Sequence, residues 1–371
     1  MARNPAHDVA IYAPLAALFY GGAQRQIGGA EVQTTMLARE LARRDLAVAH
    51  VVYPLENDPR LDNPTLVERP PWQGPGRAPQ EAWAGWGGLR RADAASYVIR
   101  GSGGHAIAAA AFCAAYRRPL IFSTSNDLDF DFQREDRRPL VLGIYRRAIG
   151  LARRMVVQTE HQRELARSAG FDPWVIPSFA EPAQRTTETP RHFLWANRLV
   201  EYKLPREYLQ LAAAVPEAHF IMIAGKTSET TPELEEFVRA EAERLPNVEL
   251  HRARQRAAMH EAMAASAAVV TTSRVEGMPN MFLEAWAMGV PVLSLHVDPD
   301  RRITDGGMGI HAGGSMERLI EGARSLWNDS AMRTEIGDRA RAFVRSHHGQ
   351  STVGDRWEAL VREVVGKPVS T

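Results

Sequence analysis

The stretch SRVEGMPNMFLEAWA, residues 273–287, decides the fold that we expect for this chain. An apolar run over residues 268–272 precedes it and predicts a strand, and the apolar spacing over residues 280–288 predicts a helix. Pro279 stands near the first helical position, where its missing amide costs nothing. A second apolar run follows at residues 290–295. Strand, turn, helix and strand in this order predict a parallel βαβ unit.

Two glutamates mark this stretch. Glu276 lies in the loop before the helix, and Glu284 lies more than one turn inside it, with seven residues between them. The amides of Gly277, Met278 and Asn280 are expected to be free at the helix start, as in an anion site. A glutamate pair near a helix start can also merely cap the helix.

Length and composition set the class of protein. The 371 residues are 45% hydrophobic and 24% charged with a net charge of +1, which excludes a disordered chain. The length exceeds what one core usually supports, so two domains are expected. One cysteine, Cys113, excludes an intramolecular disulfide framework and a cysteine-based zinc site.

Charge is distributed unevenly along the chain. Residues 1–178 hold 22 arginines against 18 acidic residues and no lysine, which suits an anionic ligand or a membrane surface. No basic run is dense enough to predict nucleic-acid binding. No signal peptide and no uncharged stretch of membrane-spanning length is visible, so we expect a cytoplasmic protein, with peripheral contact to the inner face of a membrane left open.

Short apolar runs alternate with amphipathic helical stretches on both sides of a linker rich in Pro, Ser, Thr and Glu. This alternation predicts two Rossmann-like, doubly wound α/β domains that face each other across a cleft, with the ligand at the carboxyl ends of the strands. The expected parts are a first domain over 1–178, a linker over 179–191, a second domain over 192–348, and a helix over 349–371 that returns to the first domain. The expected strands are 9–13, 46–53, 96–99, 120–123, 155–159, 192–196, 220–224, 248–251, 268–272 and 290–295, and the expected helices are 30–44, 105–116, 140–153, 162–168, 206–215, 234–244, 259–265, 280–288, 316–328, 331–347 and 352–365.

One segment interrupts the first domain. Residues 69–88 combine Trp72, Trp83 and Trp86 with several glycines and prolines, which predicts a long functional loop. The tryptophans would either contact an acceptor or simply fix the loop to the domain.

Cations and glycines follow several of the expected strands. Arg198 and Lys203 lie five residues apart after the strand that opens the second domain, where they can converge on a diphosphate, although such a pair is more often a surface feature. Gly28 and Gly29 precede the first helix and would let the backbone approach an anion closely. Their spacing is not that of the dinucleotide fingerprint, which argues against a nicotinamide-dependent oxidoreductase.

Taken together, these residues resemble the glycosyltransferase family 4 group (glycosyl transferases group 1), which has the GT-B fold. The resemblance rests on Glu-Gly-Met-Pro-Asn, the second glutamate in Glu-Ala-Trp, and the following residues 289–292, and it makes the capping interpretation less favoured. It implies that Glu276 contacts the donor sugar and Glu284 the ribose of a nucleotide. It also implies that Arg198 and Lys203 hold the diphosphate, and that the turn at Gly28 and Gly29 reaches the donor phosphate and the acceptor. The implied donor-binding residues are Gly28, Gly29, Arg198, Lys203, Gly225, Arg252, Glu276, Gly277, Met278, Pro279, Asn280 and Glu284.

The acceptor side is expected in the first domain. Arg100 and His105 flank a glycine turn after a strand, where His105 is a candidate catalytic residue beside Glu276, Arg198 and Lys203, or a neutral helix cap. Asp127 ends the next strand region and could face the acceptor. Several family members carry a histidine at the position aligned with Ser123, and its absence puts any role of that histidine in doubt here.

The segment 127–131 (DLDFD) mimics the D-x-D metal motif of the other glycosyltransferase fold. We interpret it as a loop with at most one active-site aspartate and expect no essential metal and no cofactor. The helix over 137–154 carries Arg137, Arg138, Arg146, Arg147, Arg153 and Arg154 among apolar residues, which indicates either a solvated face or contact with an anionic membrane.

The expected activity is therefore that of a retaining, metal-independent hexosyltransferase of polysaccharide biosynthesis. Its donor would be a UDP-, GDP-, ADP- or TDP-sugar, and its acceptor a hydroxyl of a glycan, a glycolipid or a small molecule. Two alternatives stay open: another GT-B nucleotide-sugar enzyme such as an epimerase, and a non-catalytic nucleotide-sugar binder. A pyridoxal-dependent phosphorylase is disfavoured because the chain has only three lysines.

Overall fold

The computed structural model describes most of the chain and divides it into two compact units. The described residues are 4–20, 28–55, 63–69, 78–133, 138–181, 183, 190–252 and 256–367, with the backbone alone for 78–82. The first unit extends to Phe179 and resumes at Gln350, and the second unit comprises Ala180–Gly349.

The first unit is built on a parallel seven-stranded sheet in the order β3-β2-β1-β4-β5-β6-β7. The chain runs outward from β1 to one edge and then from β4 to the other, so β1 and β4 are neighbours at the centre. Its strands are β1 (His7–Tyr12), β2 (Val48–Val52), β3 (Thr65–Glu68), β4 (Ala94–Arg100), β5 (Leu120–Ser123), β6 (Arg154–Val157) and β7 (Trp174–Val175).

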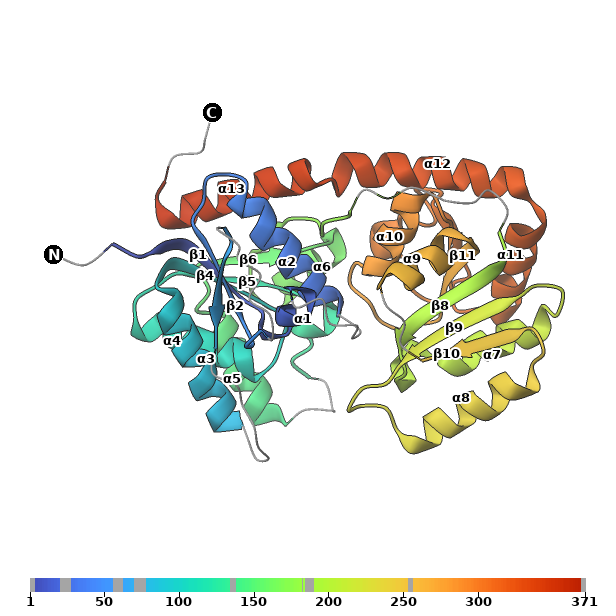
Figure 1. Ribbon diagram of the computed structural model, residues 1–371, viewed down its shortest axis with the longest axis horizontal. Coiled ribbons are helices and arrows are strands. Elements are labelled where there is room, and N and C mark those ends of the chain that lie inside the picture. The colour runs from blue at the N-terminus through green and yellow to red at the C-terminus, as the bar shows by residue number, and fades with distance from the viewer. Residues whose placement is uncertain are drawn as a thin grey trace. The chain divides into compact units, whose positions relative to one another are not determined.

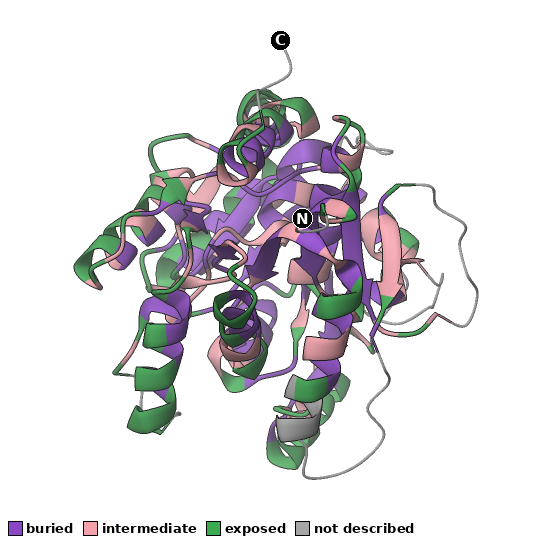
Figure 2. Ribbon diagram, turned by 90° about the vertical axis from the view of Figure 1, so that its left-hand side faces the viewer, coloured by how far each residue is buried: buried purple, intermediate pink, exposed green. Residues whose placement is uncertain are grey.

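Helices cover both faces of this sheet (Figure 1). Alternation along β4 makes the two faces visible: Tyr97 and Ile99 pack into one apolar core, and Val98 packs into the other. The first core is covered by α3 (Ala78–Ala92), α4 (Gly104–Ala115) and α5 (Pro139–Ile149), and the second by α2 (Gly29–Ala42) and α13 (Gln350–Val365), which pack against each other. The remaining helical segments are η1 (Pro14–Ala16), α1 (Ala17–Tyr20), η2 (Asp127–Phe130) and α6 (Glu160–Ser168). Figure 2 shows the buried strands in purple and the exposed outer faces of the helices in green.

The second unit is built on a parallel six-stranded sheet in the order β10-β9-β8-β11-β12-β13. Counted from its first strand, this is the 3-2-1-4-5-6 order of a Rossmann fold. The strands are β8 (His192–Arg198), β9 (Phe220–Gly225), β10 (Val248–His251), β11 (Ser266–Thr271), β12 (Val292–Ser294) and β13 (Gly309–His311). One face of this sheet is covered by α7 (Pro205–Ala214), α8 (Pro232–Arg244) and α11 (Met316–Asn328). The other face is covered by α9 (Arg256–Ala264), α10 (Asn280–Met288) and α12 (Ser330–His347). The unit also contains the short segments η3 (Glu201–Lys203) and η4 (Pro299–Arg301).

Side-chain amides and backbone bonds define where the chain passes between the units. Gln33 donates to the carbonyl of Phe179 at 2.8 Å and accepts from its amide at 2.7 Å, which fixes Phe179 to α2. The next amide, that of Ala180, donates at 2.9 Å to the carbonyl of His348 in the second unit. The division thus falls inside one peptide bond, near the start of the linker expected over 179–191.

The structure corrects our interpretation of residues 69–88 as a long loop, because α3 begins at Ala78. Its glycines are required by close packing: a Cβ on Gly88 would lie 2.9 Å from side-chain atoms of Arg69 and Val51. Trp86 packs edge-on against Phe112 at 5.2 Å between ring centroids. Trp83 is 76% exposed, and Trp72 lies outside the described residues.

Candidate functional site

The centre of the second sheet is a topological switch point. The chain leaves β8 toward one edge of the sheet and leaves the neighbouring β11 toward the other, so the loops after these two strands diverge. In open α/β sheets, ligands bind at the carboxyl ends of the strands at such a point. The loops after β8 and β11 carry Arg198, Lys203 and Glu276, so the sheet order brings these predicted residues to one place.

Backbone bonds hold the loop after β8 against the loop after β11. The amide of Arg274 donates to the carbonyl of Tyr202 at 3.0 Å, and the hydroxyl of Thr272 donates to the carbonyl of Lys203 at 2.7 Å. Leu204 follows with a φ of 49°, a left-handed conformation that costs a non-glycine residue about 1–2 kcal/mol. This turn ends η3 and aims the side chain of Lys203 toward the second loop.

Lys203 and Glu276 form an ion pair between Nζ and Oε1. Their side chains are 9% and 17% exposed, so the charges are largely withdrawn from water. The Lys203 ammonium also lies 5.2 Å from the centre of the Tyr202 ring, and burial raises the pKa of that phenol. Each charged group therefore holds the other in place, and an anionic ligand would have to compete with Glu276 for the ammonium of Lys203.

Arg198 lies near the same aromatic ring. Its guanidinium is 5.8 Å from the Tyr202 ring centre and bonds to the Tyr202 hydroxyl, and its Nη1 lies 3.1 Å from Oε2 of Glu229. The side chain is about half exposed and can turn toward a ligand. Tyr202 thus brings the two predicted cations together.

Glu284 lies on α10 in a different set of contacts. Its Oε1 is 3.1 Å from Nη2 of Arg256, and its Oε2 is 3.5 Å from Nε2 of His260. Arg256 also contacts Glu181 at 3.0 Å. A carboxylate has about four lone-pair positions, so Glu284 retains capacity for hydroxyl donors.

The turn between the two glutamates leads into the start of α10. Pro279 is the N-cap residue and makes no side-chain cap bond, and its carbonyl accepts from the amide of Phe282 at 3.0 Å. Neither Glu276 nor Glu284 caps the helix, which removes that alternative for the pair. Gly277 is buried in this turn, Met278 packs on the adjacent core, and Asn280 is the first helical residue.

The smaller donor-side candidates lie along the neighbouring strands. Gly225 pairs with Arg198 in register and accepts from the amide of Leu199 at 2.8 Å, so it lies beside the cationic loop. Lys226 is ion-paired with Glu235 at 2.5 Å. Arg252 is exposed after the edge strand β10.

The switch point of the first sheet, between β1 and β4, carries the other predicted turns. Gly28 is the N-cap of α2 and Gly29 its first helical residue, and both are exposed. A Cβ on Gly28 would collide with the carboxylate of Glu31, which folds back over this helix start. His105 is exposed in the first turn of α4, where its Nε2 lies 3.3 Å from the carbonyl of Arg100.

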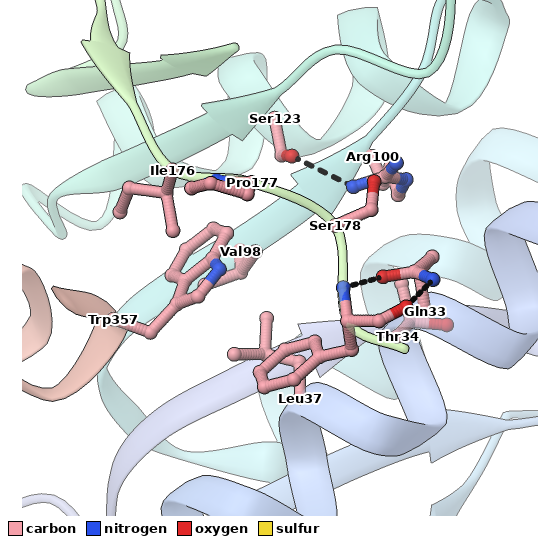
Figure 3. A pocket seen from close by; sticks show the side chains of 11 residues that line it. Gln33, Thr34, Leu37, Val98, Arg100, Ser123, Ile176, Pro177, Ser178 and Trp357 are labelled. Atoms are coloured by element: carbon pink, nitrogen blue, oxygen red, sulfur yellow. Dashed lines mark hydrogen bonds between the residues drawn. The ribbon is translucent and has the colours of Figure 1, made fainter. Parts of the chain in front are cut away.

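Arg100 ends β4 and lies in register with Ser123 of β5. Its side chain lines a small cavity of the first unit, and its Nη1 donates to Oγ of Ser123 at 3.2 Å (Figure 3). Ser123 also accepts from Nε2 of Gln158 at 3.4 Å. Ser123 thus takes part in a polar contact with Arg100 and Gln158.

The aspartates of the DLDFD segment serve separate local roles. Asp129 is fully buried and accepts from the amides of Ser102, Ser125 and Asn126 and from the hydroxyls of Thr124 and Ser125, at 2.6–3.3 Å. Asp127 accepts from Nε2 of Gln162 at 3.0 Å, and its Oδ2 lies 3.7 Å from Nε2 of His161. The segment forms η2, capped by Asn126, and so is not the loop that we expected. Within the described ranges, no group of three or more His, Cys, Asp or Glu side chains is arranged to hold a metal ion.

Two family models cover most of the chain. Residues 27–184 match the model described as Glycosyltransferase Family 4, and residues 191–329 match the model described as Glycosyl transferases group 1. The chain belongs to this glycosyltransferase family.

Solved structures give the same fold. Sucrose-phosphate synthase from Thermosynechococcus elongatus matches with a TM-score of 0.79 at 13% identity, over 96% of this chain and 99% of that chain. HepE from Anabaena, in complex with UDP and glucose, matches at 0.74 and 15% identity over the same shares. WaaG, a glycosyltransferase involved in lipopolysaccharide biosynthesis, matches at 0.69 and 17% identity, over 96% of this chain and 100% of that chain. The expected GT-B fold is confirmed.

Three side chains that contact the predicted residues were not expected from the sequence: Tyr202, Arg256 and His260. Tyr202 stands between the two cations in the sequence, and its aromatic ring was a visible signal. Arg256 and His260 are four residues apart, a spacing that places both on one face of α9. Nothing in the sequence indicates that this face meets Glu284, because α9 and α10 are brought together only by the packed sheet.

Proposed function

We propose that the chain is a retaining glycosyltransferase that takes its sugar from a nucleoside-diphosphate sugar bound at the switch point of the second unit. The observation that carries this proposal is the Lys203–Glu276 ion pair, with Arg198 beside it on the ring of Tyr202. Arg198 and Lys203 would hold the diphosphate, Glu276 would orient the sugar, and Glu284 would accept from a ribose hydroxyl.

The chemistry follows from charge development. When the bond between sugar and diphosphate breaks, negative charge builds on the leaving diphosphate, and fixed cations lower that barrier. Losing one comparable electrostatic donor costs about 2.7–4 kcal/mol. In the free protein, Glu276 holds the ammonium of Lys203 in position, and the incoming phosphate oxygens would replace it.

We propose that the anomeric configuration of the sugar is retained. This retention would not depend on two carboxylates flanking the bond, which is the arrangement that glycosidases use. The departing diphosphate would instead accept the proton of the attacking hydroxyl. Because two side-chain cations are available for the diphosphate, we propose no essential metal and no cofactor. Full activity after treatment with EDTA is the expected result.

Uridine nucleotides are the first donors to test. One similar structure is HepE with UDP-glucose, and another is TarM with UDP and α-GlcNAc-glycerol. GDP-, ADP- and TDP-sugars complete the set. The acceptor would be a hydroxyl of a glycan, a glycolipid or a small molecule, and a cytoplasmic location would give access to nucleotide sugars.

A thermal-shift screen of the full chain against the four nucleoside-diphosphate sugars tests this proposal. A donor present at about 100 times its dissociation constant should add about 2.7 kcal/mol of stability. The selected donor is then incubated with the enzyme, and release of nucleoside diphosphate is measured. A selective shift with slow release supports a transferase, whereas a shift without release supports a non-catalytic binder. No shift with any nucleotide contradicts the proposal.

Proton NMR of the first sugar product tests retention. The anomeric proton coupling should match that of the donor. An inverted product contradicts the retaining mechanism, and a C2 epimer with no transfer identifies the epimerase alternative.

We also propose contact with an anionic membrane through α5. Leu140, Val141 and Ile144 are 75%, 44% and 45% exposed on this helix, and Arg138 and Arg147 are exposed beside them. An apolar stripe flanked by arginines suits the boundary of a bilayer with anionic head groups.

Arg137 lies outside the described residues, and no described helix is long and apolar enough to cross a membrane. Co-sedimentation with phosphatidylglycerol vesicles, lost in Leu140→Ser/Ile144→Ser and absent with phosphatidylcholine, is expected; equal sedimentation of the variant contradicts the proposal.

A further inference from the structure

The carboxylate of Glu284 is contacted by two side chains of the neighbouring helix α9. Its Oε1 lies 3.1 Å from Nη2 of Arg256, and its Oε2 lies 3.5 Å from Nε2 of His260. Helices α9 and α10 lie side by side in the second unit (Figure 1). Each oxygen of the carboxylate therefore has one contact with α9, and these two contacts restrict rotation of the group.

A single nitrogen of Arg256 serves two carboxylates. Nη2 donates to Oε2 of Glu181 at 3.0 Å and lies 3.1 Å from Oε1 of Glu284. This nitrogen carries two hydrogens, so it can direct one toward each carboxylate. Glu181 follows Ala180, whose amide donates to the carbonyl of His348 at 2.9 Å, so this segment is itself fixed in the second unit. Glu181 thus anchors the guanidinium that meets Glu284.

The stability of α9 does not explain why an arginine stands at position 256. Arg256 is the first residue of the helix, and the helix dipole favours anions, rather than cations, at this end. Its side chain is 27% exposed, and partly exposed ion pairs contribute little to the stability of a fold. The position of Arg256 is better explained by its effect on Glu284.

Both helices are fixed to the rest of the second unit. The carbonyl of Ala262 in α9 lies 2.8 Å from Nε2 of His192 in β8, and Nε1 of Trp286 in α10 donates to the carbonyl of Met308 at 2.9 Å. The contacts of Glu284 with α9 are therefore made between two fixed elements. Such support from packed elements keeps a binding group in one orientation.

Glu284 keeps bonding capacity on both of its oxygens. A carboxylate offers about four lone-pair positions, and the contact with Arg256 uses one of them on Oε1. His260 lies beside Oε2, but its buried Nε2 makes no hydrogen bond at this distance. The two vicinal hydroxyls of a ribose can donate to the two oxygens of one carboxylate, whereas a 2′-deoxyribose has only one of these hydroxyls.

We propose that Arg256, anchored by Glu181, is a positioning residue that orients Glu284 toward both ribose hydroxyls and so selects ribonucleotide donors. The enzyme would then take UDP-, GDP- or ADP-sugars and discriminate against TDP-sugars, whose deoxyribose lacks the 2′-hydroxyl. A deoxyribonucleotide would leave one oxygen of a largely buried carboxylate without its donor, which is costly. The inference rests on the proposed function, because it narrows the donor class of that reaction.

Two other roles for Arg256 lead to different expectations. If Arg256 only joins α9 to α10, its loss should weaken the binding of ribonucleotides and deoxyribonucleotides equally. If Arg256 competes with the ribose for Glu284, its loss should strengthen the binding of the ribonucleotide. If it positions Glu284, its loss should weaken mainly the binding of the ribonucleotide, so the ratio of the two affinities separates the three roles.

Calorimetric titration of the full chain measures this ratio. The probes are UDP, GDP and ADP, each compared with its 2′-deoxy counterpart. Wild type should bind the preferred ribonucleotide about 10-fold or more tightly than the deoxy form. In Arg256→Met the ratio should fall below about 3-fold, while the affinity for the deoxy form changes by less than about 3-fold. Glu181→Ala, which removes the anchor, should give an intermediate ratio.

Arg324→Met is the matched control. Arg324 also joins two elements of the second unit, because its Nε donates to Glu217 at 3.2 Å and its Nη2 donates to the carbonyl of Ala214 at 2.9 Å. Both partners precede β9, so they lie at the amino ends of the strands, opposite the candidate site. This variant should keep the ratio of wild type.

Three results would overturn the inference: equal binding of the two nucleotides by wild type, an unchanged ratio in Arg256→Met, or tighter ribonucleotide binding by that variant. If Arg256→Met does not fold, an unchanged ratio in Glu181→Ala takes the place of the second result.

The donor screen separates this inference from the proposed function. Selection of a TDP-sugar would overturn the inference and leave the proposed transferase standing. Discrimination through Arg256 without release of nucleoside diphosphate would support the inference and contradict the transferase. A chain that binds no nucleotide would contradict the proposed function and this inference with it.

Discussion

Replacing Lys203 with alanine removes the positive charge that we propose binds the leaving diphosphate. The backbone of this turn should not move, because its bonds, from Thr272 to the Lys203 carbonyl and from the Lys203 amide to Val200, do not involve the side chain. Loss of one electrostatic donor of this kind costs about 2.7–4 kcal/mol, a fall of about 100- to 1,000-fold in turnover. The affinity for nucleoside diphosphate should also fall, by about 10-fold or more, since a hydrogen bond to a charged group contributes about 1.5–3 kcal/mol.

The stability of the same variant follows from the exposure of the pair. Breaking a fully buried ion pair costs about 3–5 kcal/mol, but water reaches the 17% exposed carboxylate of Glu276, so we expect about 1–2 kcal/mol. The double variant Lys203→Ala/Glu276→Ala removes the orphaned charge as well and should recover that stability.

Calorimetry with the selected nucleoside diphosphate, denaturant unfolding and release of diphosphate measure the three quantities separately. Lys367→Ala is the matched control, because that lysine pairs with Asp8 within the first unit, whereas the candidate site belongs to the second unit. If the Lys203–Glu276 pair is only structural, the double variant Lys203→Ala/Glu276→Ala should bind nucleotide as tightly as wild type. That result, or near-normal turnover in Lys203→Ala, would refute the reasoning.

Three further perturbations test other residues. Glu284→Gln should abolish a preference of about 10-fold or more for UDP over its 2′- or 3′-deoxy analogues, measured by calorimetry, and equal discrimination by the variant would exclude Glu284 from the ribose contact. Asp129→Ala leaves several buried donors unpaired, so it should cost at least about 3 kcal/mol and lower the melting temperature by about 6–12 °C, whereas an unchanged melting temperature would show that these bonds are not structural. Burial lowers the pKa of His50 to about 3, so between about pH 6.5 and 3 only the unfolded chain takes up a proton at this residue. The free energy of unfolding should therefore fall by about 1.4 kcal/mol for each pH unit between pH 6 and 4. His50→Gln can still accept from the Tyr20 hydroxyl and should flatten this pH dependence in urea unfolding; an unchanged dependence would show that other groups cause it.

Much of the second unit could be predicted because its local signals agree. The helix expected over 280–288 has the bounds of α10, since apolar spacing, a proline at its start and Gly289 at a φ of 70° after its end all indicate the same segment. The order of strands and loops also predicted that Arg198, Lys203 and Glu276 would lie near the carboxyl ends of the strands. The edge strands β3, β7 and β13, with the sequences TLVE, WV and GIH, were not expected.

The remainder depends on tertiary packing. Helix α3 contains glycines and a proline that predict a loop, yet Gly88 allows the helix to approach Val51 and Arg69. The contacts of Glu284 with Arg256 and His260 join two helices that only the sheet brings together.

The central claim is that Arg198, Lys203 and the two glutamates hold a nucleotide sugar and help to break its glycosidic bond. The most direct test is the rate at which wild type and Lys203→Ala release nucleoside diphosphate from the donor selected by thermal shift, at saturating donor. We expect release by wild type, a rate about 100- to 1,000-fold lower in Lys203→Ala, and an unchanged rate in Lys367→Ala. Equal rates in wild type and Lys203→Ala, or no release by any of them, would contradict it.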